Sequence, residues 1–211
     1  MNASENDIRI RFTNKMLLVL LVPLMVEQLL AATIGAADTL MVTSVGEAAL
    51  SGVSIVDQIN ILLIQIFAAL ATGGAVVIAQ YIGQGERKSA RSAAKQLVYA
   101  STGLASAIAL AALLFARPIL RGLFGTIDDA VMKNAHTYFV YSVLSYPFLA
   151  IYNAGVAVQR AMGDSKSSMK IGILTNVTNV FGNALLIFVF KWGVAGAAIA
   201  SLFSRALGAV I

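Results

Sequence analysis

Residues 16–42, with the sequence MLLVLLVPLMVEQLLAATIGAADTLMV, form an apolar segment longer than the roughly 20 residues needed to cross a lipid bilayer. Three of its residues are unusual in a membrane helix: Pro23, Glu27 and Asp38. A carboxylate near the centre of such a helix costs roughly 2.5 to 3.5 kcal/mol to insert. Because side chains this costly are typical of functional positions, the segment is predicted to be a membrane helix that carries a functional carboxylate.

The composition of the whole chain is that of an integral membrane protein. Of its 211 residues, 59% are hydrophobic and 12% are charged, and the mean hydropathy is +0.83. These three values lie far from those of a water-soluble domain. The apolar residues form long blocks rather than short alternating segments, which favours helices over a membrane barrel. We therefore predict an all-α fold, a polytopic bundle of six transmembrane helices.

The charges between the apolar blocks predict the orientation of the bundle. The blocks are 16–42, 50–81, 93–116, 136–158, 171–190 and 194–211. With residues 1–15 as a cytoplasmic tail, ten basic residues fall on the cytoplasmic side and four on the other. This asymmetry follows the positive-inside rule. It predicts a multi-pass protein of the cell membrane in which a six-helix lobe, 16–211, follows the tail.

The connection between the first two blocks and the polar residues of the second give two further predictions. The connection 43–49 is short, so the two blocks are expected to pack as an antiparallel pair. In the second block Asp57, Gln65 and Thr72 recur at intervals of eight and seven, with Asn60 close by, which predicts one polar face. Such a face either lines a cavity, with Gln65 in its wall, or joins helices through hydrogen bonds.

Blocks four and five carry the remaining polar candidates. Tyrosines such as Tyr138, together with Asn153, either belong to the interfacial aromatic belt or line a pocket for flat or cationic molecules. Asn176, Asn179 and Asn183 stand at positions i, i+3 and i+7, so their amides share one helical face. Three aligned amides are credible partners for a carboxylate, and they also suit hydrogen bonding between helices.

Several classes of function are disfavoured by what the sequence lacks. It has no cysteine and a single histidine, His136, and we find no cluster with metal-ligand spacing, so an enzyme is not expected. The basic residues are scattered between apolar blocks, which argues against a nucleic-acid partner. The lipid bilayer is the partner that the composition predicts.

Five separated pieces of the chain resemble the amino-terminal lobe of the multidrug and toxic compound extrusion (MATE) transporters. They are PLMVEQLLAATIGAADTLMV (23–42), VGEAALSGVS (45–54), AQYIGQGERKSA (79–90), QRAMGDS (159–165) and NVTNVFGNALLIF (176–188). Their order and spacing cover nearly the whole chain. The resemblance implies two six-helix lobes around a central cavity, which export organic cations and other drugs in exchange for protons or sodium ions, with no cofactor.

The resemblance also implies roles for individual residues. Asp38 matches the acidic residue of the first helix implicated in cation coupling, and Asn179 and Asn183 match its partners in the fifth helix. Pro23 matches the bend of the first helix. Some members carry an aspartate at the position of Asn183, so the version of the site with two carboxylates is absent here.

The family is about twice as long as this chain, which leaves two expectations. The chain is either a piece of a full transporter or a half-size transporter that acts with a second copy. A lipid-linked oligosaccharide flippase is the rival function, because related transporters share a similar helical plan. A flippase cavity is expected to be cationic, whereas no lysine or arginine lies deep in the first five blocks.

The residues of block one suggest a mechanism. Glu27 and Asp38 are eleven positions apart, about three helical turns, so both lie on nearly one face. Pro23 leaves the carbonyl of Val19 without its usual partner and gives the helix a place to bend. We hypothesise that protonation of Asp38 breaks its hydrogen bonds to the fifth-helix amides and that the first helix then bends near Pro23. Glu27 is a candidate for the cavity wall or for a counter-charge to the substrate.

Overall fold

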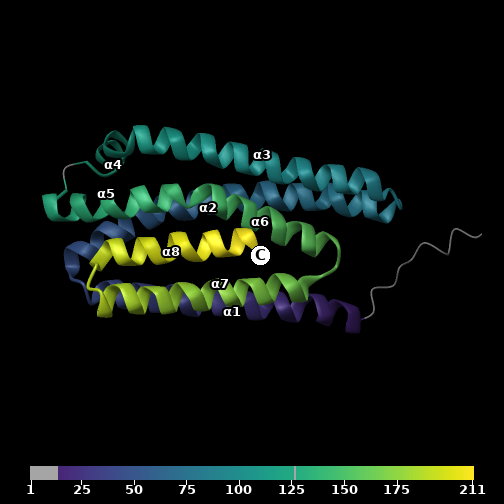
Figure 1. The fold of residues 1–211 in the computed structure, drawn as a ribbon, viewed down its shortest axis with the longest axis horizontal. Coiled ribbons are helices and arrows are strands. Elements are labelled where there is room, and N and C mark those ends of the chain that lie inside the picture. Colours follow the sequence, from purple (N-terminus) through teal and green to yellow (C-terminus); the bar gives the residue numbers. More distant parts are fainter. Residues whose placement is uncertain (1–13, 126) are drawn as a thin grey trace, which may run out of the picture.

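The computed structural model describes residues 14–125 and 127–211, and these residues form helices and no strands. Figure 1 shows the long helices running side by side along the long axis of the molecule, with the short α4 at one end. They are α1 (Asn14–Thr43), α2 (Glu47–Gly83), α3 (Arg87–Leu114), α4 (Ala116–Phe124), α5 (Asp129–Leu144), α6 (Tyr146–Ala161), α7 (Ser165–Ala184), the π-helical turn η1 (Leu185–Val189) and α8 (Gly193–Val210). The predicted tail, 1–15, lies outside the described residues except for its last two, which begin α1.

The predicted all-α bundle with six membrane spans is confirmed. Five helices are long and apolar enough to cross a membrane, and α5 and α6 together make a sixth span that bends by 46°. The break lies at Ser145, two residues before Pro147, whose ring removes a backbone donor. This span begins seven residues earlier than predicted, because the Asp128 carboxylate accepts a hydrogen bond from the Ala130 N–H at 2.8 Å and caps α5.

The first helix packs against α7 along much of its length, as Figure 1 shows. Its contact with α2 is much smaller, so the expectation that the first two blocks form a packed antiparallel pair is wrong in its packing. A short turn fixes the direction of the next helix but does not decide which neighbour a helix lies against. Asp38 of α1 accepts hydrogen bonds from amides of α7, and this contact favours the pairing.

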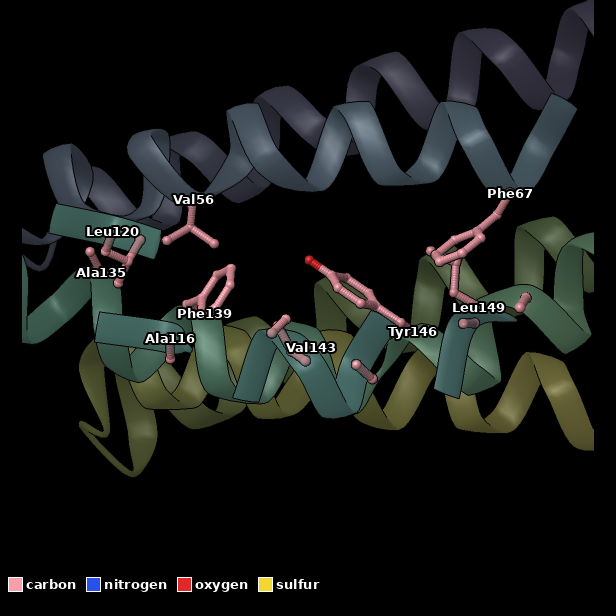
Figure 2. Close-up of a cluster of buried hydrophobic side chains, with 13 residues drawn as sticks. Val56, Phe67, Ala116, Leu120, Ala135, Phe139, Val143, Tyr146 and Leu149 are labelled. Carbon is pink, nitrogen blue, oxygen red and sulfur yellow. The ribbon is translucent and has the colours of Figure 1, made fainter. Parts of the chain in front are cut away.

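The largest apolar cluster joins α2, α3, α4, α5 and α6, and Figure 2 shows its buried side chains. Tyr146 lies at its centre, fully buried, with its ring edge-on to Phe67 at 6.0 Å between centroids. The Tyr146 hydroxyl donates to Asn60 Oδ1 at 2.8 Å. A buried tyrosine needs such a partner, because water does not reach the site. The cluster therefore fixes the bent span against α2.

Gly52 permits the close approach of α2 to α5. A Cβ atom at this position would lie 2.8 Å from the Ala135 backbone nitrogen and 2.9 Å from the Val131 carbonyl oxygen. Backbone atoms cannot move aside as a flexible side chain can. Small residues at such crossings are typical of membrane helix packing.

The Gly52→Ala substitution is therefore expected to destabilise the protein by about 1–3 kcal/mol, the usual range for overpacking. The matched control is Gly73→Ala in the same helix, where a Cβ would meet nothing within 4 Å. Thermal unfolding of the two variants in detergent measures the difference. A midpoint for Gly52→Ala at or above that of Gly73→Ala would contradict the close packing described here.

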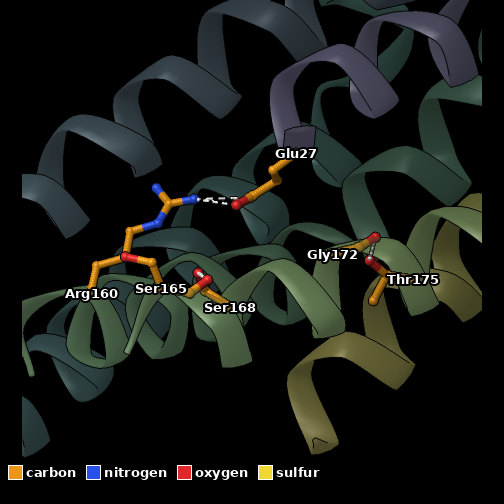
Figure 3. A network of polar contacts seen from close by, with 6 residues as sticks. All are labelled: Glu27, Arg160, Ser165, Ser168, Gly172 and Thr175. Atoms are coloured by element: carbon orange, nitrogen blue, oxygen red, sulfur yellow. Dashed lines mark hydrogen bonds and ion pairs between the residues drawn. The ribbon is translucent and has the colours of Figure 1, made fainter. Parts of the chain in front are cut away.

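An ion pair joins α1 to the end of α6 (Figure 3). Arg160 Nη2 donates to both carboxylate oxygens of Glu27 at 2.8 Å. The Glu27 side chain is 14% exposed and that of Arg160 is 36% exposed, so the pair is partly shielded from solvent. Arg160 Nε is buried without a hydrogen-bond partner. The two hydrogen bonds to Glu27 are therefore the main interaction that offsets the cost of burying this guanidinium.

Replacing Glu27 by Gln removes the charge partner of Arg160 and is expected to cost about 1–3 kcal/mol of stability, the range for a hydrogen bond to a charged group. Arg160→Gln alone should have a similar cost, and the double variant should lose less than the two costs added together. Unfolding midpoints of the four proteins in detergent give the coupling. Fully additive losses would show that the ion pair does not stabilise the bundle.

Candidate functional site

A cavity of about 420 Å³ lies between six helices of the bundle: α1, α2, α5, α6, α7 and α8. Its polar lining comes from Asp38 and Thr39, Ser54 and Asp57, Tyr138 and Tyr152, the α7 residues Thr175, Asn176, Asn179 and Asn183, and Ser201, Ser204 and Arg205. Its volume lies within the range of small-molecule sites. A cavity with this many polar groups inside an apolar bundle is typical of a binding site rather than of a packing fault.

The carboxylate of Asp38 meets the amides of α7 at one wall of the cavity. Asn183 Nδ2 donates to Asp38 Oδ1 at 2.6 Å. Asn179 best satisfies its neighbours with its nitrogen toward Asp38. In that orientation it donates to the two carboxylate oxygens at 2.8 and 3.2 Å, and its oxygen accepts from the Ser201 hydroxyl at 3.1 Å. Asp38 of α1 is thus bonded to α7 directly, and to α8 through Asn179 and Ser201.

The two amides are buried, although Asp38 itself borders the cavity. Asn183 is 1% exposed and Asn179 is 9% exposed. Asn183 Oδ1 is buried without a hydrogen-bond partner. A buried acceptor without a partner is costly, and oxygen atoms are the ligands that hard cations prefer, so this oxygen is a candidate cation ligand.

A second carboxylate, Asp57 on α2, lines the same cavity. It accepts a hydrogen bond from Asn60 Nδ2 at 3.2 Å. Asn60 is 3% exposed and also contacts Ser142 and Tyr146 of the bent span, at 3.4 and 2.8 Å. Asp57 is therefore held by a network that reaches into the apolar core.

Arg205 on α8 is a cavity residue that the sequence interpretation did not select. Its Nη1 donates to Ser145 Oγ at 2.6 Å, at the break between α5 and α6. The signal was present, since Arg205 is the one charged residue within the last apolar block, 194–211. It changes the comparison with a flippase, because the cavity contains a cationic side chain after all. Asp38 and Asp57 outnumber it.

The structure brings together some of the predicted site residues. Asp38, Asn176, Asn179, Asn183 and Tyr138 all line the cavity. Their roles in transport stay predictions.

The other predicted residues lie elsewhere. Glu27 faces Arg160, because α6 continues to Ala161 and carries Arg160 within reach of α1. Gln65 is exposed on the surface of α2, since eight residues at about 100° each turn it about 80° away from Asp57. Thr72 is exposed as well, so the single polar face predicted for α2 is wrong.

Asn153 and Pro23 also lie outside this cavity. Asn153 Nδ2 is buried in α6 without a hydrogen-bond partner, and Pro23 is buried within an unbroken α1. Among residues 14–125 and 127–211, no group of three or more carboxylate or histidine side chains is arranged to hold a metal ion.

Comparisons with known proteins place this architecture in a family. The MatE family model matches residues 23–185. The uncharacterized transporter YisQ of Bacillus subtilis is 31% identical over 193 residues, which cover 89% of this chain and 42% of that protein. The probable multidrug resistance protein NorM of Thermotoga maritima is 30% identical over 204 residues, which cover 93% of this chain and 43% of that protein.

The fold also matches solved structures. A MOP superfamily transporter from Pyrococcus furiosus superposes with a TM-score of 0.87 at 24% sequence identity, over 93% of this chain and 43% of that one. The chain thus spans less than half the length of the proteins that it matches. The resemblance read from the sequence motifs is confirmed: the chain belongs to the MatE family of transporters and corresponds to one lobe of such a protein.

Proposed function

We propose that the chain is one lobe of a cation-coupled antiporter that exports drug-like organic compounds by alternating access. The observation that carries this proposal is the Asp38 carboxylate, which borders a polar cavity and is bound by amides of α7. A carboxylate with neutral donors, rather than a permanent cation, as its partners is free to exchange a proton, a sodium ion or an organic cation. Transport, not catalysis, is the function that such a site supports.

The proposed coupling follows from the hydrogen bonds of Asp38. The ionised carboxylate accepts hydrogen bonds from the side-chain amides of Asn179 and Asn183. A proton on the carboxylate occupies one of its oxygens and weakens these hydrogen bonds. A sodium ion would instead use the carboxylate together with the free Oδ1 of Asn183. In either case the coupling ion and a cationic substrate compete for Asp38. Loss of the hydrogen bonds between Asp38 and the α7 amides would release α1 from α7, with Pro23 as the place where α1 bends.

Alternating access needs a second lobe, because in transporters built from repeats one lobe moves against the other around the binding site. The proposal therefore includes a partner lobe, supplied either by the rest of a longer protein or by a second copy. A flippase for lipid-linked oligosaccharides is disfavoured, since two carboxylates against one guanidinium would repel a pyrophosphate group.

The Asp38→Asn variant of the complete protein tests the coupling. In proteoliposomes with an imposed proton or sodium gradient, we expect at least about a tenfold loss of gradient-driven efflux of an organic cation such as ethidium, because the variant cannot exchange the coupling ion. The matched control is Glu47→Gln, an exposed carboxylate at the start of α2 that lies outside the cavity.

The gradient that drives efflux in the unmodified protein identifies the coupling ion. Efflux by Asp38→Asn that equals the control, and still follows the gradient, would show that another residue couples the ion.

We also propose that the protein lies in the cell membrane with the start of α1 in the cytoplasm. The turns after α2 and after α6 would then face the cytoplasm, and the turn after α1 would face outward. The excess of basic residues near the turns after α2 and after α6 supports this orientation.

Introduced cysteines test the orientation, because this chain contains none of its own. In intact cells a membrane-impermeant maleimide should label Ser44→Cys, in the turn after α1. It should label Gln84→Cys, in the turn after α2, only once the cells are permeabilised. The reverse pattern would invert the proposed topology.

A further inference from the structure

The guanidinium of Arg205 lies in the cavity with most of its hydrogen-bonding capacity unused. A guanidinium carries five N–H donors in a fixed fork. Arg205 makes one hydrogen bond to a side chain, from Nη1 to Ser145 Oγ at 2.6 Å. Among the described residues, no carboxylate lies within 4 Å of it to form an ion pair. Its remaining donors therefore have no partner of opposite charge.

An arginine within a membrane span is costly, and such residues usually pair with a carboxylate. Arg160 in this protein does so, with both oxygens of Glu27 at 2.8 Å. Arg205 borders the same cavity as Asp38 and Asp57 and is attracted by both, yet it bonds to neither. Its position on the cavity wall and its free fork are the features of a site for an anionic group, since the fork matches the two oxygens of a carboxylate.

The charges of the cavity decide what kind of compound can use this site. Two carboxylates and one guanidinium leave the cavity with one net negative charge when all three are ionised. A purely anionic compound is therefore repelled. A compound that carries both an amine and a carboxylate satisfies both sides, with the amine toward Asp38 and the carboxylate toward Arg205.

We propose that Arg205 is the anion subsite of the cavity, the residue that determines how tightly a compound with both an amine and a carboxylate binds there. This inference rests on the proposed export function. It concerns specificity, so its failure leaves the coupling role of Asp38 unaffected.

Arg205 has one possible structural role that a test must separate from this one. The Ser145 hydroxyl accepts from Arg205 and donates to the Ser142 carbonyl at 2.6 Å, at the break of the bent span. If Arg205 only stabilises this bend, then removing the Ser145 hydroxyl should have the same effect as removing the guanidinium. If Arg205 binds a carboxylate, the Ser145→Ala variant keeps the subsite.

Rhodamine 110 and rhodamine 123 are suitable probes, because the first is a zwitterion and the second is its methyl ester, a cation of nearly the same shape. Fluorescence titration of the complete protein in detergent measures the affinity for each dye. In the Arg205→Gln variant we expect affinity for rhodamine 110 to fall about tenfold or more, because a charge-assisted bidentate contact is lost. Affinity for rhodamine 123 should stay the same or rise.

Three further variants complete the experiment. Arg205→Lys keeps the charge but not the fork, and should bind rhodamine 110 with intermediate affinity. Ser145→Ala should bind both dyes as the unmodified protein does. Lys95→Gln removes an exposed positive charge on α3 and is the control for net charge. Binding of rhodamine 123 at least as tight as that of the unmodified protein shows in each case that the variant is folded.

The outcomes are distinct. If Arg205→Gln weakens both dyes equally, or if Ser145→Ala reproduces its effect, the side chain is structural and the proposal is wrong. Equal affinity of Arg205→Gln and unmodified protein for rhodamine 110 also overturns it. If the unmodified protein binds neither dye, the proposed drug export itself is contradicted, together with the subsite.

Discussion

The absence of water in the bilayer core is the constraint on which this structure depends. A polar side chain buried between the helices is costly unless it is hydrogen-bonded, and several in this bundle find that partner on another helix. Asp38 finds amides on α7, Asn60 finds Tyr146 and Ser142 on the bent span, and Glu27 finds Arg160 at the end of α6. Each of these contacts joins helices that are distant in sequence. Polar pairing thus selects the neighbours, while close packing of small residues such as Gly52 sets the distances.

The same contacts separate the bundle into regions with different properties. On one side, α2, α3, α5 and α6 pack through a continuous apolar cluster. On the other, α1 lies against α7, and the hydrogen bonds between Asp38 and the α7 amides are contacts that a change in charge state can break. The candidate site lies where the two regions meet. This arrangement suits a transporter, because one helix can move while the apolar cluster keeps its packing.

The sequence was sufficient to predict the helical class, the number of spans and the pairing of Asp38 with amides of block five. The first two predictions depend on long apolar runs, which are a local property. Helical spacing showed that the amides of block five share one face, and the resemblance to the MATE transporters implied that Asp38 is their partner. The sequence did not identify the partner of Glu27, because that contact depends on where α6 ends. It also did not show that Asp57 and Arg205 share a cavity with Asp38, since only the packing of α8 between α5, α6 and α7 brings them together.

The Glu27–Arg160 pair has a consequence for the synthesis of the protein. Its two residues are 133 positions apart, and Asp38 precedes Asn183 by 145. At a translation rate of about 5–20 residues per second, the first helix waits on the order of ten seconds before either carboxylate can meet its partner. During that time its two carboxylates, Glu27 and Asp38, have no partner from a later helix. The first helix must therefore tolerate being in or near the membrane without these partners, and both contacts can form only when α7 has emerged from the ribosome.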